Sequence, residues 1–322
     1  MRKLSPKENL LRLIRFQDPE YIPYGLESTK GFTQKEALSF KGSGDPNVPE
    51  WPDAWGVGYK AVDKSISDNP YPVSHPLKSY EQLESFKFPN PADPELFSEI
   101  EEQIKSVNRQ ENLIMFSNPH FLFVRSWLLR GMEEALTDIL TDPENYEALL
   151  EKIYLYQEAI IKRTLEFKPD IILFGDDAAT TKDLMMNPAL WRKMIKPRLK
   201  KFFDLCRDAG CFVYLHCCGC IEDILDDVIE IGADILNPIQ ASANDFRYVK
   251  DRAKGKLVLL GGIDAHKVYT GDPEAVADLT RKTMGILGEG GGYIAAVDQS
   301  LPFPKENIEA IKKVVLEEGS LK

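Results

Sequence analysis

The sequence predicts one α/β barrel domain, spanning residues 1–322, in which strands and helices alternate along the chain. Short apolar runs are followed repeatedly by amphipathic segments that carry helix-start signals. Several apolar runs are continuous rather than alternating, as expected for parallel strands that are covered on both faces. A chain of 322 residues suits this architecture, because strand–helix barrels of this length are routinely a single domain.

The first predicted element is a helix that runs to Phe16. Ser5 is a suitable N-cap, Pro6 is compatible with the first helical position, and Glu8 stands where a capping box has its acidic partner. Seven apolar runs are then predicted as strands. They lie at Ile22 to Leu26, Leu113 to Phe116, Ile171 to Gly175, Cys211 to His216, Asp234 to Asn237, Leu257 to Gly261 and Tyr293 to Val297.

Three longer helices have clear start signals between these strands. They open at Asp142-Pro143, Asn187-Pro188 and Asp272-Pro273, and the first two end near Phe167 and Gly210. Pro197 lies inside the second helix, which predicts a kink or break near Met194. The segment from about 29 to 94 is rich in Gly, Pro, Ser and Asp and has little periodicity, so we expect long loops over the barrel mouth.

The composition excludes several classes of partner and location. The formal net charge of −11 disfavours nucleic-acid binding, and it would repel a polyanionic substrate unless basic residues gather at the site. The N-terminal segment lacks the apolar core of a signal peptide, and no apolar run approaches the ~18 residues of a membrane span. All five cysteines lie between positions 206 and 220, too local for a disulfide framework. We therefore expect a cytoplasmic protein that acts on a small molecule.

Reactive groups in such a barrel are expected where strands end and loops begin, because side chains fill the interior. The candidate segments each follow an apolar run directly. They are Gly175-Asp176-Asp177, His216 to Cys220, Asn237 to Gln240, Gly261 to Asp264, and Val297-Asp298-Gln299.

The strongest local feature is the segment FVYLHCCGC, in which a histidine and several thiols follow a strand. Residues two apart in a strand point to the same face, so His216 and Cys218 are favoured over His216 and Cys217 as a metal-binding pair. A catalytic zinc needs three protein ligands and one open position, so this pair needs a partner. The alternative is that these cysteines are ordinary small buried residues and that His216 is hydrogen-bonded in the core.

Carboxylates and amides complete the set of candidates. Asp176 and Asp177 are candidate catalytic groups or ligands, and helix capping or loop solvation is the alternative. Asp298 follows the last strand and is a candidate metal ligand or a simple turn residue. Asp53, in WPDAWG, is a further candidate acid or base. Four residues are candidate substrate-binding groups: Asn237, Gln240, Asp264 and His120.

The chain resembles the uroporphyrinogen decarboxylase superfamily over nearly its whole length. The most specific stretches are FGDDAATTKDLMMNPALWRKMIKPRLKKFFDLCRDAG, LHCCGCIEDILDDVIEIGADILNPIQ, LLGGID and GGGYIAAVDQSLPFPKENIEAI, which match in order and spacing. The resemblance implies a (β/α)8 TIM barrel with its ligand site at the carboxyl-terminal mouth. The superfamily includes the haem-pathway decarboxylase and the methyltransferases of corrinoid-dependent one-carbon metabolism.

The methyltransferase branch is the closer of the two. The decarboxylase branch has an arginine-bearing MRQAGR-like segment and a late histidine, whereas this chain has IPYGLESTKG and AAVDQSLP at those places. The methyltransferase zinc site uses a His-x-Cys pair, which His216 and Cys218 match, and a late cysteine that is absent here. Asp298 or Asp177 would then complete the site. The resemblance implies transfer of a methyl group between methylcobalamin, carried by a partner corrinoid protein, and a thiol or other acceptor.

Two other functions stay open at this point. One is a metal-free carboxy-lyase in porphyrin biosynthesis or a related reaction, in which Asp177 or Asp53 acts on a carboxylated substrate. The other is a non-catalytic partner of a corrinoid system that kept the barrel and lost its third ligand.

Overall fold

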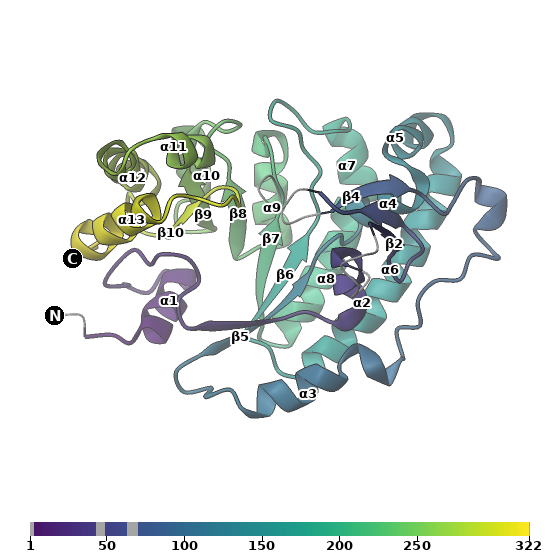
Figure 1. Ribbon diagram of the computed structural model, residues 1–322, viewed down its shortest axis with the longest axis horizontal. Helices are drawn as coiled ribbons and strands as arrows, with labels where there is room; N and C mark the ends of the chain where they lie inside the picture. The colour runs from purple at the N-terminus through teal and green to yellow at the C-terminus, as the bar shows by residue number, and fades with distance from the viewer. Residues whose placement is uncertain (1–2, 43–48, 63–69, 322) are drawn as a thin grey trace.

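The computed structural model describes residues 3–42, 49–62 and 70–321. Seven parallel strands form one curled sheet (Figure 1) in the order β1-β5-β6-β7-β8-β9-β10. Their bounds are β1 Thr29–Phe32, β5 Leu113–Asn118, β6 Ile171–Gly175, β7 Phe212–His216, β8 Ile235–Ile239, β9 Val258–Ile263 and β10 Tyr293–Val297. Because the strands are parallel, their carboxyl-terminal ends lie on the same side of the sheet. The strand ends that carry candidate residues therefore lie next to one another.

Six of the seven predicted strands are confirmed, and the first is wrong. Residues 22–26 contain only an isolated bridge between Tyr24 and Ala295, whereas the strand that pairs with β5 lies at Thr29–Phe32. Pro23 has no backbone N–H to donate, and Gly25 has a φ of 65°, so this segment does not continue as a regular strand. The apolar composition of 22–26 reflects burial rather than strand structure.

The predicted helices are confirmed, including the break at Pro197. The first helix is α1 (Pro6–Ile14), where Ser5 accepts a hydrogen bond from the Glu8 N–H. The long helix is α6 (Pro143–Glu166), and the helix after Asp272 is α12 (Pro273–Leu287). The segment opened by Asn187 divides into α7 (Pro188–Met194) and α8 (Lys196–Asp208), because proline cannot donate the hydrogen bond that would join them.

The remaining helices were not predicted individually. They are α2 Lys35–Leu38, α3 Ser98–Lys105, α4 Phe123–Arg130, α5 Met132–Thr141, α9 Leu225–Ile231, α10 Phe246–Ala253, α11 Ala265–Thr270 and α13 Lys305–Glu318. Helices cover the outer face of the sheet: α8 packs on β7, and α12 packs on β9 and β10. None of the described helices is long and apolar enough to cross a lipid bilayer.

A small apolar core closes one end of the curled sheet. Leu10, Leu13 and Ile14 of α1 pack against inward-facing residues of six strands, among them Ile171 and Ile294. Burial of each leucine stabilises the fold by about 1.5–3 kcal/mol. Since α1 fills the sheet at its amino-terminal end, ligands can approach from the carboxyl-terminal end.

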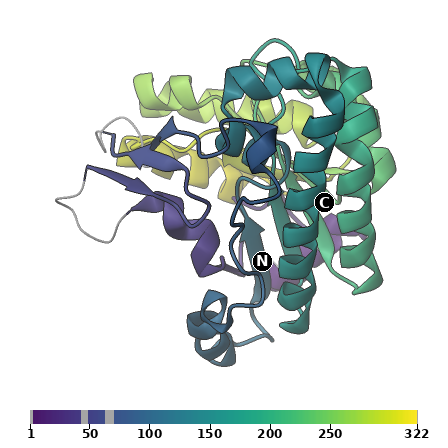
Figure 2. The same ribbon diagram turned by 90° about the vertical axis from the view of Figure 1, so that its right-hand side faces the viewer.

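The segment between residues 29 and 94, predicted as loop-rich, contains short elements that form an accessory sheet. Its strands are β2 (Glu50–Pro52), β3 (Gly58–Lys60) and β4 (Tyr71–Ser74), paired antiparallel in that order. Figure 2 shows these strands projecting from one side of the molecule. This accessory sheet forms one wall of the cavity described below.

Candidate functional site

Strand register brings the main candidates together. Gly175 at the end of β6 is level with His216 at the end of β7, and His216 is level with Asn237 of β8. The residues that follow each strand therefore emerge side by side at the carboxyl-terminal edge of the sheet.

Asp177, His216 and Cys218 form a compact group with one donor atom each within 4.8 Å of the others. The Cys218 Sγ lies 3.5 Å from the His216 Nε2, and an Asp177 carboxylate oxygen lies 3.7 Å from the same nitrogen. All three side chains are partly buried. We refer to these residues as the Asp-His-Cys group.

Asn237 determines which nitrogen of His216 faces this group. The Asn237 Nδ2 donates to the Leu260 carbonyl oxygen at 3.3 Å, which directs the Asn237 Oδ1 toward the His216 Nδ1 at 2.7 Å. An amide oxygen only accepts, so the Nδ1 carries the proton. The Nε2 therefore faces Cys218 and Asp177, which is the orientation of the free nitrogen in a metal-binding histidine.

The electrostatics of the Asp-His-Cys group disfavour a free thiolate. Burial, and next the Asp177 carboxylate, raise the pKa of Cys218 to about 12. The Cys218 backbone N–H donates to Asp177 at 2.7 Å, and the Gln299 side-chain amide donates to the Cys218 Sγ at 3.6 Å. A divalent cation bound beside the thiol would replace the negative charge near the sulfur with a positive one.

The structure separates Asp176 and Asp298 from this group. Asp176 is buried and accepts hydrogen bonds from the backbone N–H groups of residues 122–124, at the start of α4. Burial raises the pKa of Asp176 to about 6. Asp298 accepts from the Ala241 N–H at 2.7 Å and the Ala265 N–H at 2.9 Å. Both carboxylates hold loops at the strand ends.

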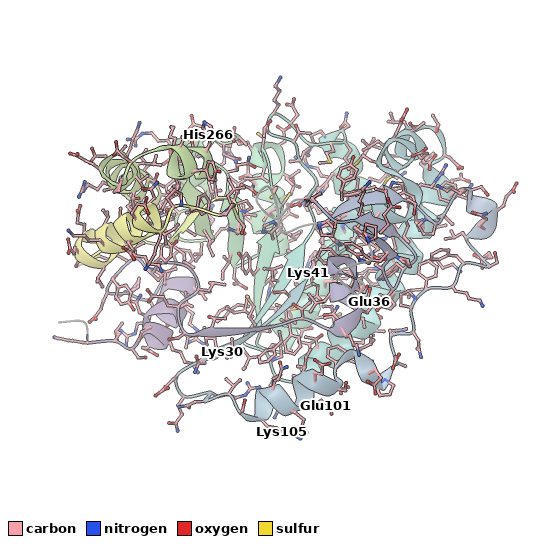
Figure 3. All side chains as sticks on the ribbon, in the orientation of Figure 1. Lys30, Glu36, Lys41, Glu101, Lys105 and His266 are labelled. Atoms are coloured by element: carbon pink, nitrogen blue, oxygen red, sulfur yellow. The ribbon has the colours of Figure 1, made fainter. Side chains whose placement is uncertain are left out.

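Two predicted substrate-binding residues also face loops. Gln240 accepts from the Gly219 N–H at 3.0 Å, so it supports the turn that carries Cys218. Asp264 accepts from the Lys267 N–H at the start of α11 and lines a separate cavity of 290 Å³. His266, on α11, lies far from Lys41 and the accessory sheet (Figure 3).

A cavity of 570 Å³ adjoins the Asp-His-Cys group, and His216 and Asp177 contribute to its lining. His120 also lines it, with its ring 4.5 Å from that of Phe40. Burial, and next the charge of Arg125, lower the pKa of His120 to about 3, so the imidazole is neutral at pH 7. The structure thus brings His120, His216 and Asp177 to one cavity.

Asp53 lies in a buried polar contact away from the Asp-His-Cys group. Its carboxylate accepts from the Arg125 Nη1 at 3.0 Å and from the Trp55 and Val57 N–H groups at 2.9 Å. Arg125 also lies over the Trp55 ring. This pair joins the accessory sheet to α4.

Sequence reasoning missed the accessory wall of the cavity. Phe40, Tyr59 and Trp127 line the cavity, yet they are far apart in the chain and none of them follows a strand of the curled sheet. The aromatic residues of WPDAWGVGY were the available signal, because they are unusual in a segment otherwise typical of exposed loops.

Comparison with known proteins is consistent with this architecture. The structure is similar over 98% of its length to 99% of a methyltransferase from Methanosarcina mazei, with a TM-score of 0.71 and 17% sequence identity. A B12-independent methionine synthase from Shewanella sp. W3-18-1 is 15% identical and has a TM-score of 0.45, with 67% of this chain and 64% of that chain covered. The search of curated proteins finds no match.

The family model for uroporphyrinogen decarboxylase (URO-D) matches residues 51–317. The match begins within the accessory sheet and continues into α13, so it contains the whole Asp-His-Cys group and most of the curled sheet. The chain belongs to the uroporphyrinogen decarboxylase family.

Proposed function

We propose that this chain is a zinc-dependent methyltransferase that moves a methyl group between a corrinoid protein and a thiol or another acceptor. The observation that carries the proposal is the Asp-His-Cys group, with a nitrogen, a sulfur and a carboxylate oxygen within 4.8 Å of one another. These donor types are the ones that zinc takes in proteins.

The residues of this group fit a catalytic zinc. Asp177, His216 and Cys218 supply three ligands, and a catalytic zinc site has three protein ligands and one open position. His216 has its Nε2 lone pair directed into the group, because Asn237 holds the other ring nitrogen. Asp177 takes the place in the ligand set that the resemblance assigns to a late cysteine. When bound, zinc would supply Lewis acidity, which would lower the pKa of an acceptor thiol.

The chain's own residues supply positioning. Asn237 orients His216, Gln240 supports the turn after Cys218, and Gln299 donates to the Cys218 sulfur. The cavity of 570 Å³ next to Asp177 gives a substrate access to the group and reduces its contact with water.

The cavity lining disfavours a polycarboxylated substrate. Among the described residues, Lys41 is the one Lys or Arg side chain in the lining, and it is exposed. A substrate with several carboxylates needs several cations to replace the water that it loses. This supports methyl transfer over decarboxylation of a porphyrinogen.

A partner protein would present methylcobalamin at the open side of this cavity. Tyr71 is 66% exposed and lies between Pro70 and Pro72, which both line the cavity. Val73 is 44% exposed on the same strand. Exposed apolar side chains that cluster at a site entrance are typical of surfaces that bind another protein.

Elemental analysis of protein purified without a histidine tag tests the metal site. We expect about one zinc per wild-type chain, and loss of zinc in Cys218→Ser and Asp177→Asn. Cys220→Ser and Asp298→Asn are matched controls, because Cys220 and Asp298 lie outside the Asp-His-Cys group. No zinc in the wild type after reconstitution, or equal zinc in all variants, would contradict the proposal.

Transfer of the methyl group from methylcobalamin to a thiol, followed by the cobalamin absorbance, tests the activity. We expect wild-type protein to catalyse the transfer, and Cys218→Ser to lose it. Zinc binding together with a stable corrinoid-protein complex, but no transfer to any thiol, would instead identify a non-catalytic partner.

We also infer that the curled sheet closes into a barrel through the irregular segment that leads into β1. Residues 23–28 lead into the edge strand β1, and backbone hydrogen bonds join them to the other edge strand, β10, and to β5. Ala295 N–H donates to the Pro23 carbonyl at 2.9 Å, Gly25 N–H donates to Ala295 at 2.8 Å, and Leu113 N–H donates to Ser28 at 2.7 Å. The first two bonds join the segment to β10 and the third continues the pairing of β1 with β5, so these contacts support closure between the edge strands β10 and β1.

A further inference from the structure

We propose that the substrate of this site is an aromatic compound without negative charge on its body, whose ring binds between the accessory sheet and the strand ends. The proposal rests on the proposed function for the reacting end of the substrate. It goes beyond that function because it assigns a chemical class to the body of the substrate, which is the part that does not react.

The cavity extends from the Asp-His-Cys group to the accessory sheet. Gly175, Asp177 and His216 line one part, at the ends of β6 and β7. Tyr59 of β3 and Pro72 of β4 line another part. A molecule in this cavity therefore has one end at the candidate metal ligands and its body against the accessory sheet.

The walls around the body are rich in aromatic and aliphatic side chains. Phe40, Tyr59 and Trp127 contribute aromatic rings, and Leu128 and Pro72 contribute aliphatic surface. Phe40 packs against Tyr59 with ring centroids 6.0 Å apart and against His120 at 4.5 Å. Aromatic rings prefer offset or edge-to-face contacts with one another, so a ring of the substrate can pack against these side chains in the same way.

The charges around the cavity oppose an anionic body. Among the described lining residues, the charged groups are Lys41, at the surface, and Asp177, at the reacting end. Figure 3 shows Lys41 on the segment that carries Glu36, next to the accessory strands. Arg125 is already paired with Asp53 behind the wall. His120 is neutral at pH 7, so it adds no cation.

Three lining residues have buried polar atoms without a hydrogen-bond partner. They are the Tyr59 hydroxyl, the His120 Nδ1 and the Trp127 Nε1. Each such atom is an exception to the rule that buried polar groups are paired. One or two hydroxyl or carbonyl groups on the ring of a substrate would satisfy part of this set after small side-chain rotations.

The cavity is large enough for a substituted aromatic ring. Its volume of 570 Å³ falls in the range of about 300–1,000 Å³ that is typical of small-molecule sites. The aromatic walls, the scarcity of charge and the unpaired polar atoms thus favour the same class of molecule.

Isothermal titration calorimetry with three probes tests this inference. The probes are 4-mercaptophenol, 2-mercaptoethanesulfonate and 4-methylphenol, which lacks the thiol and so does not depend on zinc. We expect wild-type protein to bind 4-mercaptophenol at least about tenfold more tightly than the sulfonate, a difference of about 1.4 kcal/mol. We expect 4-methylphenol to bind both zinc-loaded and zinc-depleted protein.

Variants connect this binding to the cavity. Trp127→Leu should weaken 4-methylphenol binding about tenfold, because it removes one ring face. Tyr59→Phe keeps the ring and the packing, so it tests the hydroxyl without endangering the fold. Tyr269→Ala is the matched control, because Tyr269 is 49% exposed on α11, outside the cavity lining. Circular dichroism checks the fold of each variant.

The outcomes separate this inference from the proposed function. Binding of 4-methylphenol that Trp127→Leu weakens supports the inference, even where the protein holds no zinc and the methyltransferase proposal fails. Equal or tighter binding of the sulfonate by zinc-loaded protein would overturn the inference while leaving the zinc site intact. Failure of 4-methylphenol to bind, or binding that Tyr269→Ala weakens as much as Trp127→Leu, would also overturn it.

Discussion

Replacing Asn237 with leucine removes the group that orients His216 while keeping a side chain of similar size. In the structure the His216 Nδ1 donates to the Asn237 Oδ1 at 2.7 Å, and the Asn237 Nδ2 is held by the Leu260 carbonyl oxygen. In the leucine variant the Nδ1–H has no acceptor at this position. The neutral imidazole can then carry its proton on the Nε2, which is the nitrogen that faces Cys218.

The expected effect is a weaker zinc site in a folded protein. Loss of a partner that orients a metal-binding histidine costs about 10–100-fold in metal affinity, which is about 1.4–2.8 kcal/mol. This is consistent with loss of one buried hydrogen bond and the desolvation of its donor, about 1–3 kcal/mol. Competition with a chromogenic zinc chelator measures the dissociation constant, and thermal unfolding of the metal-free protein checks the fold.

A conservative variant tests the physical reason. Asn237→Asp keeps an oxygen acceptor for the His216 Nδ1–H, so it should retain zinc more tightly than Asn237→Leu. His216→Ala gives the zinc affinity that remains when the ligand itself is lost. Wild-type zinc affinity in Asn237→Leu, together with loss in His216→Ala, would refute the orienting role of Asn237. Equal weakening in the aspartate and leucine variants would show that packing, rather than the acceptor, is responsible.

Two further predictions concern the buried polar contacts behind the accessory sheet. Arg125→Leu should lower the free energy of unfolding by about 3–5 kcal/mol in urea denaturation, because Asp53 becomes an uncompensated buried charge. The double variant with Asp53→Asn should recover part of this loss, and no recovery would contradict the ion-pair argument. Burial raises the pKa of Glu36 from 4.5 to about 7, so the folded protein favours its protonated form. The free energy of unfolding should therefore fall as pH rises across that interval, and Glu36→Gln should remove about 3 kcal/mol of this decrease. If the variant and the wild type differ in free energy of unfolding by the same amount at every pH, the prediction is refuted.

Much of the fold could be predicted because its signals are local. Continuous apolar runs marked six of the seven strands of the curled sheet, and Asp-Pro or Asn-Pro pairs marked the starts of α6, α7 and α12. The break between α7 and α8 followed from Pro197 alone, because proline has no N–H to donate. The strand β1 was missed because its four residues, TKGF, have no apolar periodicity and their pairing with β5 is non-local.

The candidate site was predictable in part for the same reason. His216 and Cys218 could be paired from their two-residue spacing, although β7 ends at His216 and Cys218 lies in the loop that follows, and Asp177 could be placed after a neighbouring strand end. The choice between Asp177 and Asp298 was not available from the sequence. The structure directs the Asp298 carboxylate to two backbone N–H groups and brings Asp177 to His216, which depends on how three separate loops pack.

The sequence by itself determined the alternating architecture, the end of the sheet that carries polar residues, and the His-x-Cys pair. These features depend on residue order and on the spacing of residues along the chain, which are local properties. Only the tertiary structure decided which carboxylate joins His216, which nitrogen of His216 faces Cys218, and that the accessory sheet forms one wall of the cavity. These outcomes depend on contacts between residues far apart in the chain, whose geometry is set when the strands align and the core packs.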